Sequence, residues 1–194
     1  MVDRVAELES IVAKHDLNQH PFYSDWRAGT LPVDKLRDYA GEYGRFVALI
    51  AQGWETLGEE GYANEERVHE GLWKDFQAAI GSEKRSNRSK TELLLHAANT
   101  LFAPEAEAVG ALYAFEAQQP ITSRTKLEGL EEHYNLDAAG TEYFRVHADD
   151  VHEVKTLEHR IGVLSDEEFA RAKTACSILC AAMWGALDGV YYSA

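Results

Sequence analysis

The sequence predicts an all-α protein, a bundle of about seven or eight helices, and three observations lead to this prediction. Apolar residues recur every three or four positions along nearly the whole chain, which is the period of an amphipathic helix. Short alternating stretches bounded by hairpin turns do not stand out. The chain has only four prolines, and each stands where a helix is expected to begin or end: Pro21, Pro32, Pro104 and Pro120.

The N-terminal part is expected to contain two helices joined by a short element. Hydrophobic periodicity predicts a first helix over about residues 3–15. The stretch HPFYSDWRAG, residues 20–29, is expected to form the short element. A long helix begins near Pro32, because proline suits the first turn of a helix, and it runs to about Leu57.

Two helices are expected on either side of a polar loop in the middle of the chain. The first covers about residues 64–80 and ends at Gly81, since glycine is favoured just after a helix. Residues 82–89, SEKRSNRS, form the loop. Ser89-Lys-Thr-Glu92 is a capping box, in which both side chains bond to free backbone N–H groups, and it opens a helix through LLLHAANTLF.

The C-terminal half is expected to be helical throughout. Further helices are expected over about residues 104–119, 121–134 and 141–164. Ser165-Asp-Glu-Glu168 is a second capping box and opens the final helix. A length of 194 residues suits one core, so residues 1–194 are expected to form a single helical domain.

Charge and composition exclude several classes of protein. The formal net charge of −14 argues against a nucleic-acid partner, which would require clustered Lys and Arg. We expect no membrane partner, because no apolar run approaches the length of a span, and MVDRVAELES lacks the apolar segment of a signal peptide. Cys176 and Cys180 are spaced for neither a structural disulfide nor a zinc site. The expected location is the cytoplasm.

The stretch EYFRVHADDVHE contains two histidines and two neighbouring aspartates, and helical geometry separates its side chains. On a continuous helix, residues three, four and seven apart share a face. His147 then lies in the middle of the apolar face, and Asp150 lies at its edge. Asp149, His152 and Glu153 fall on the opposite, solvated side. A bulge in the helix would change this register.

Two other helices also place metal-ligand residue types on apolar faces, namely Glu66 and His69 on one helix and Glu116 on the other. A carboxylate within an apolar stripe is costly unless something pairs with it. Taken singly, each such residue is more often a hydrogen-bonded core residue than a ligand. Together with His147 and Asp150, however, they form a His and carboxylate set that suits iron or manganese. Glu66-Arg-Val-His69 also has the Glu-x-x-His spacing of di-iron helical bundles.

Longer stretches resemble the haem-oxygenase-fold superfamily. They are HPFYSDWRAGTLPVDKLRDYAGEYGRF, HEGLWKDFQAAIG, ALYAFEAQQPITSRTKLEGLEEHYNL, YFRVH and MWGALDGVY. The nearest group is the CADD-like proteins, the iron-containing redox enzymes also called haem-oxygenase-like di-iron oxidases, and PqqC and TenA are more distant. The resemblance covers nearly the whole chain. It implies a haem-oxygenase-like helical bundle and a homodimer.

The resemblance also implies roles for individual residues. His69, Glu116 and His147 stand where the family carries metal ligands. Tyr23 and Lys126 fall where related proteins carry a reactive tyrosine and a lysine near the metals, so these two are the candidate catalytic residues.

The sequence departs from the family pattern at two points. Tyr62 stands where the family has a glutamate seven residues before the histidine, so Glu66 or Glu65 would have to replace it. The family's His-x3-Asp-x2-His run is shortened before Asp150 and again before His152. By helical geometry Asp150 still points inward and His152 does not. One metal ion, two ions or a metal-free pocket therefore all stay open.

Three functions follow from these observations. The first is a non-haem iron oxidase or oxygenase with one or two iron ions, or manganese, that acts with dioxygen on a small organic substrate or on its own Tyr23. The second is a metal-free enzyme, similar to PqqC or TenA, that binds a small aromatic substrate. The third is a non-catalytic helical binding protein. The metal content of the purified protein would distinguish them.

Overall fold

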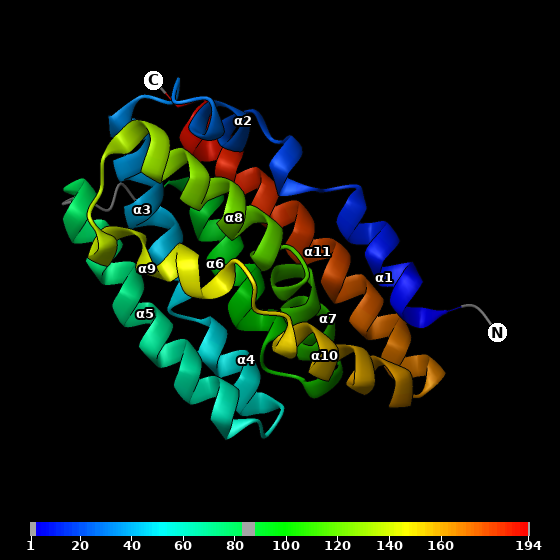
Figure 1. The fold of residues 1–194 in the computed structure, drawn as a ribbon. Helices are drawn as coiled ribbons and strands as arrows, with labels where there is room; N and C mark the ends of the chain where they lie inside the picture. The colour runs from blue at the N-terminus through cyan, green and yellow to red at the C-terminus, as the bar shows by residue number, and fades with distance from the viewer. Residues whose placement is uncertain (1–2, 83–87, 194) are drawn as a thin grey trace.

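The structure is a computed structural model that describes residues 3–82 and 88–193. These residues form helices and no strand, so the prediction of an all-helical protein is confirmed (Figure 1). The α-helices are α1 (Arg4–Ala13), α2 (Pro21–Arg27), α3 (Val33–Val47), α4 (Ile50–Thr56), α5 (Glu60–Ile80), α6 (Ser89–Leu101), α7 (Glu105–Glu116), α8 (Gln119–Gly129), α9 (Ala138–His147), α10 (His152–Val163) and α11 (Asp166–Tyr191). A short 3-10 helix, Leu17–Gln19, precedes α2, and a π-helical turn, Leu130–Tyr134, follows α8.

The longest helix, α11, packs along α7 and α6 and also touches α1 and α3 (Figure 1). Its first turn carries the predicted capping box: the Ser165 hydroxyl accepts a hydrogen bond from the Glu168 N–H at 3.3 Å, and the Glu168 carboxylate accepts one from the Ser165 N–H at 2.8 Å. Against the sequence expectation, α11 is apolar and long enough to cross a membrane by length and composition alone. Its side chains from Ala172 to Val190 supply part of the hydrophobic core, so in this fold α11 has the position of a core helix.

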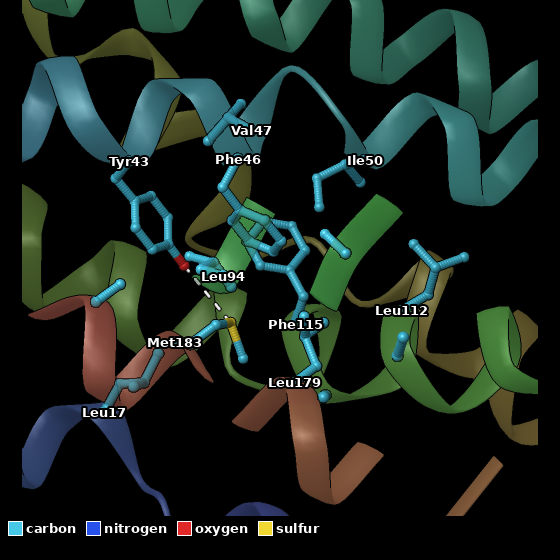
Figure 2. Packing of buried hydrophobic residues seen from close by; sticks show 14 of the residues in the cluster. Leu17, Tyr43, Phe46, Val47, Ile50, Leu94, Leu112, Phe115, Leu179 and Met183 are labelled. Carbon is cyan, nitrogen blue, oxygen red and sulfur yellow. Dashed lines mark hydrogen bonds between the residues drawn. The ribbon is translucent and has the colours of Figure 1, made fainter. Parts of the chain in front are cut away.

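The long helix expected from Pro32 to Leu57 is broken, and that expectation is wrong. Helix α3 ends at Val47 and α4 begins at Ile50. The chain turns because the Leu49 N–H donates to the Phe46 carbonyl at 2.9 Å, three residues back, which tightens the end of α3. Phe46, Val47 and Ile50 point into the same apolar cluster on either side of this turn (Figure 2).

The capping box expected at Ser89 is also absent. Arg88 is the residue before the first turn of α6, and no side chain caps that turn. Ser89 lies inside the helix instead. Residues 83–87 of the expected polar loop lie outside the described residues.

The most consequential difference concerns the helix expected over residues 141–164. Helix α9 ends at His147 and α10 begins at His152. The Asp150 carboxylate accepts a hydrogen bond from the His152 N–H at 3.1 Å. A side chain that bonds to a nearby backbone N–H in this way favours a helix start over a continuous helix. The two halves therefore have independent registers, and side chains after Ala148 do not point where a single helix would place them.

Close contact between α7 and α11 yields a prediction about stability. A Cβ added at Gly110 would lie 1.8 Å from the Ala172 carbonyl oxygen, so Gly110→Ala should force the two helices apart and destabilise the fold by about 1–3 kcal/mol or more. Gly71, in the middle of α5, has no neighbour within 4 Å of an added Cβ, so Gly71→Ala should stabilise the fold by about 0.5–1 kcal/mol. Urea unfolding followed by circular dichroism measures both changes. Equal stability of the two variants would contradict this packing.

Candidate metal centre

Four helices bring buried metal-ligand side chains together at one place. Helix α5 carries Glu66 and His69, Glu116 is the last residue of α7, His147 is the last residue of α9, and Glu153 lies in the first turn of α10. Each of the three glutamates is at most 4% exposed, His147 is 1% exposed and the His69 side chain is 14% exposed. Five donor groups are thus held inside the bundle on elements far apart in the sequence.

These side chains form two groups that share one carboxylate. Donor atoms of Glu66, His69 and His147 all lie within 4.8 Å of one another. Donor atoms of Glu66, Glu116 and Glu153 do the same. Glu66 belongs to both groups.

Hydrogen bonds orient the donor atoms. His147 Nδ1 lies 2.6 Å from the Tyr143 carbonyl oxygen, and because a carbonyl only accepts, Nδ1 carries the proton. The lone pair of a neutral imidazole is then on Nε2, the nitrogen left free for a metal. Trp54 Nε1 donates to one oxygen of Glu116 at 3.3 Å, and His69 Nδ1 lies 3.0 Å from one oxygen of Glu66.

Each member of the cluster except His69 also has a buried polar atom without a hydrogen-bond partner. These atoms are Oε2 of Glu66, Oε2 of Glu116, Oε1 of Glu153 and Nε2 of His147. Buried polar groups are normally hydrogen-bonded, so four unpartnered atoms in one cluster require an explanation. All four are metal-donor atoms, and carboxylate with imidazole is a donor set that suits iron. The residues present therefore fit a metal centre.

Burial also changes the protonation of the cluster. It raises the pKa of the Glu116 carboxyl well above its ordinary value, and Glu153 and Glu66 add to this by repulsion. Burial together with Glu66 raises the pKa of Glu153 to about 9. Burial and the neighbouring His69 ring lower the pKa of His147 to about 4. Without a cation, the cluster is therefore expected to hold protons on carboxyl groups, and the His147 imidazole is expected to be neutral, at neutral pH.

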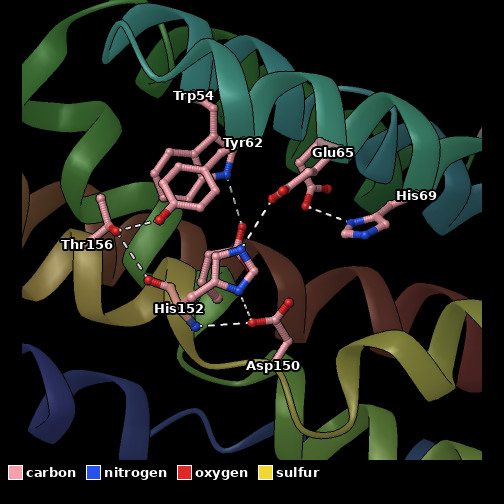
Figure 3. A network of polar contacts seen from close by, with 9 residues as sticks. Trp54, Tyr62, Glu65, His69, Asp150, His152 and Thr156 are labelled. Atoms are coloured by element: carbon pink, nitrogen blue, oxygen red, sulfur yellow. Dashed lines mark hydrogen bonds and ion pairs between the residues drawn. The ribbon is translucent and has the colours of Figure 1, made fainter.

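Two residues were placed differently by sequence reasoning. Asp150, expected at the inward edge, belongs to neither buried group; its carboxylate instead contacts the His152 ring at the protein surface (Figure 3). Glu153 was expected to be solvated and is 4% exposed. The break before α10 causes both differences. A helix counted from His152 onward would have found Glu153, because it shares its face with the buried Leu157 and Ile161.

His152 and Glu65 lie outside the buried cluster. The His152 side chain is 47% exposed, as expected, and its Nε2 lies 3.2 Å from the carboxylate of Glu65 (Figure 3). Tyr62, at the family's glutamate position, stacks near Trp54 with ring centroids 4.7 Å apart and shares a 2.7 Å hydrogen bond with Thr156. Glu66, one turn on, is the α5 carboxylate that enters the cluster.

Comparison with known families identifies the group to which this fold and cluster belong. Residues 47–185, more than half of the chain, match the family model described as iron-containing redox enzyme. The chain belongs to the iron-containing redox enzyme family. Membership confirms the resemblance drawn from the sequence and places the protein among oxidoreductases.

Several relatives in this family carry the name 4-aminobenzoate synthase. The protein of that name from Nitrosomonas europaea is 28% identical, with 95% of this chain and 89% of the relative covered. The one from Chlamydia muridarum is 26% identical, with 94% of this chain and 87% of the relative covered. These two relatives are similar to this chain over nearly their whole length.

Solved structures share the fold of this family member. A TenA homolog from Pseudomonas syringae superposes with a TM-score of 0.78 at 16% identity, covering 96% of this chain and 92% of that one. A Shewanella denitrificans domain of unknown function with a haem-oxygenase-like fold superposes with a TM-score of 0.75 at 18% identity, covering 96% of this chain and 91% of that one. The predicted haem-oxygenase-like bundle is therefore confirmed.

The two predicted catalytic residues also meet in this iron-containing redox enzyme. Tyr23 on α2 is 1% exposed and Lys126 on α8 is 2% exposed. Lys126 Nζ lies 4.7 Å from the centroid of the Tyr23 ring. Burial lowers the pKa of the Lys126 amine to about 7, so near neutral pH a large share of it is uncharged and has a free lone pair. The Tyr23 hydroxyl lies 3.1 Å from that of Tyr39.

The raised pKa of Glu153 predicts how the metal-free protein responds to pH. Between the ordinary carboxyl value of 4.5 and about 9 the folded state holds a proton that the unfolded chain has lost. The contribution of Glu153 to stability should therefore fall as pH rises through this window, by about 1.4 kcal/mol per pH unit. Glu153→Gln removes this titration. From about pH 7 to about pH 8.5 the variant should gain about 2 kcal/mol relative to the wild type.

Urea unfolding in the presence of a chelator measures this difference at each pH. The lowered pKa of His147 changes stability in the opposite direction, but only below its ordinary value of 6.5, outside the measured range of about pH 7 to about pH 8.5. Titrating groups outside the cluster are common to both proteins and cancel in the difference. A difference in unfolding free energy that stays constant with pH would show that Glu153 is ionised in the folded protein.

Proposed function

We propose that the protein is a non-haem iron oxidase whose buried centre is formed by Glu66, His69, Glu116, His147 and Glu153. The observation that carries this proposal is the pair of donor groups sharing Glu66, with four donor atoms left without any other partner. The family's description as iron-containing redox enzymes supports iron over manganese. The two groups, which share Glu66, would hold two ions.

Charge balance supports this centre. Three carboxylates in an apolar interior repel one another, and each loses several kcal/mol of hydration when ionised there. Lys126 carries a lowered pKa and so cannot neutralise them fully at neutral pH. Divalent ions can neutralise the three carboxylates, and they would displace the protons that the metal-free cluster holds.

Ferrous iron at this centre would supply electrons for the reduction of dioxygen. The chain's own residues contribute exclusion of water and orientation of the donors. Trp54 holds Glu116 through its indole N–H, and the Tyr143 carbonyl fixes the His147 ring. The Tyr143 ring also packs on His147, with centroids 4.3 Å apart, and covers the cluster on the side of α9.

The organic substrate that the structure supports best is the protein's own Tyr23. Relatives are named for 4-aminobenzoate, a benzene ring with an amino group opposite a carboxylate. Tyr23 provides such a ring, with an oxygen opposite its Cβ, and Lys126 places a nitrogen 4.7 Å from the ring centroid. In the proposed reaction the Lys126 nitrogen forms a C–N bond to the Tyr23 ring, and the ring C–O bond breaks with its oxygen leaving as water. The Nζ–Cε bond of Lys126 breaks as Cε is oxidised to an aldehyde. The Cα–Cβ bond of Tyr23 also breaks, so that Cα takes a hydrogen and Cβ is oxidised to the carboxylate, and dioxygen accepts the electrons of both oxidations and is reduced to water.

A metal-binding experiment tests the centre. Apo-protein titrated calorimetrically with Fe(II) in the absence of oxygen should show saturable binding. Glu153→Ala or Glu116→Ala should weaken it tenfold or more, on the order of the losses seen when groups that hold a metal site are removed. Asp150→Ala serves as the matched control, because Asp150 belongs to neither buried group, and it should bind nearly as well as the wild type. Unsaturable binding, or binding unchanged by Glu116→Ala, would mean that the cluster is not a metal centre.

Peptide mass spectrometry tests the substrate. After iron loading and exposure to air, the peptide containing Tyr23 should lose its ring, and Lys126 should lose its side-chain nitrogen. Tyr23→Phe and Lys126→Met should each prevent release of 4-aminobenzoate, and Tyr192→Phe, which changes a largely exposed ring, should not. If Tyr23 stays intact while oxygen is consumed, the substrate is instead a free small molecule.

A further inference from the structure

A third group of donor side chains lies beside the buried centre and reaches the surface. Donor atoms of Glu65, His152 and Glu153 all lie within 4.8 Å of one another. Glu65 and His152 point toward each other (Figure 3), and their side chains are 52% and 47% exposed. Glu153, in contrast, is 4% exposed. One end of this outer group is therefore open to solvent and the other is inside the protein.

Glu153 connects the outer group to the buried centre. It is a member of the outer group and also of the buried group with Glu66 and Glu116. Its Oε1 is buried and has no hydrogen-bond partner. From the surface inward, the outer group shares Glu153 with one buried group, and that buried group shares Glu66 with the other buried group. A cation could pass along this line by exchanging one ligand at a time.

The donor chemistry of the outer group suits a divalent first-row metal. Both ring nitrogens of His152 face carboxylates, because Asp150 contacts Nδ1 and Nε2 lies 3.2 Å from the carboxylate of Glu65. A bound ion would take the place of the proton between Nε2 and Glu65, while Asp150 orients the ring through Nδ1. Two carboxylates and one oriented imidazole form a set that binds Fe(II) or Co(II). The net charge of −14 also draws cations toward the surface.

We propose that Glu65, His152 and Glu153 form a metal-loading site, which captures a divalent ion from solvent and passes it through Glu153 to the buried centre. This proposal rests on the proposed function, since it requires a centre to be filled. It explains how an ion reaches carboxylates that are at most 4% exposed, and it gives a role to the exposed donors that the buried centre does not use.

Stopped-flow absorption with Co(II) tests the loading role, because Co(II) has visible bands that report binding and does not start oxygen chemistry. The variants are His152→Ala and Glu65→Gln, which change exposed side chains. His159→Ala is the matched control, since it removes an exposed imidazole from the same helix, α10. The uptake rate of His152→Ala should fall about tenfold, in line with the effect of charged surface groups on association rates. Its final stoichiometry and affinity should match those of the wild type and of the control.

Two outcomes would overturn the loading role alone. One is an unchanged uptake rate in both outer variants with normal final binding. The other is a loss of affinity or stoichiometry in His152→Ala as large as that in Glu116→Ala, which would make His152 a permanent ligand. Absence of saturable Co(II) binding by the wild-type protein would instead overturn the proposed function, and the loading site with it.

Discussion

Three carboxylates buried in one helical core are the constraint on which the rest of this site depends. Glu66, Glu116 and Glu153 stand on three different helices and are almost completely excluded from solvent. An ionised carboxylate in such a place is several kcal/mol less favourable than in water, so the cluster must bind protons or cations. The raised pKa values of Glu116 and Glu153 are one consequence, and the unpartnered donor atoms are another. An arrangement of carboxylates with this unfavourable free energy is expected where the carboxylates serve the function of the protein.

The break between α9 and α10 determines which side chains enter the cluster. If the two helices were continuous, Asp150 would lie near His147 and Glu153 would face solvent. Because the chain turns at residues 148–151, His147 ends one helix inside the core and Glu153 begins the next one inside the core. Asp150 and His152 stay at the surface between them, where they meet Glu65. A local change of direction thus produces both the buried centre and the outer group.

Aromatic side chains connect the buried carboxylate and histidine cluster with the buried tyrosine and lysine. Tyr143 contacts His147 on one side and Trp73 on the other, with ring centroids 4.3 and 4.8 Å apart. Trp73 in turn lies 5.8 Å from Tyr39, whose hydroxyl meets that of Tyr23. The rings of Tyr23 and Tyr39 lie with their centroids 4.7 and 5.9 Å from Lys126 Nζ and exclude water from it, and this burial keeps the pKa of the amine low. The same apolar packing that stabilises the bundle therefore also lowers the pKa of this amine.

The sequence by itself determined the helical class and the inward faces of single helices. Periodicity placed Glu66, Glu116 and His147 on apolar faces, and all three are buried, because within one uninterrupted helix the register follows from residue spacing. The resemblance also paired Tyr23 with Lys126, which the structure brings together. Tertiary structure alone decided where the helices over 32–57 and 141–164 break, since no proline or glycine marks either turn. It therefore decided that Glu153 and not Asp150 enters the cluster, because the direction of a side chain beyond a turn depends on how the next helix packs and not on counting from the last one.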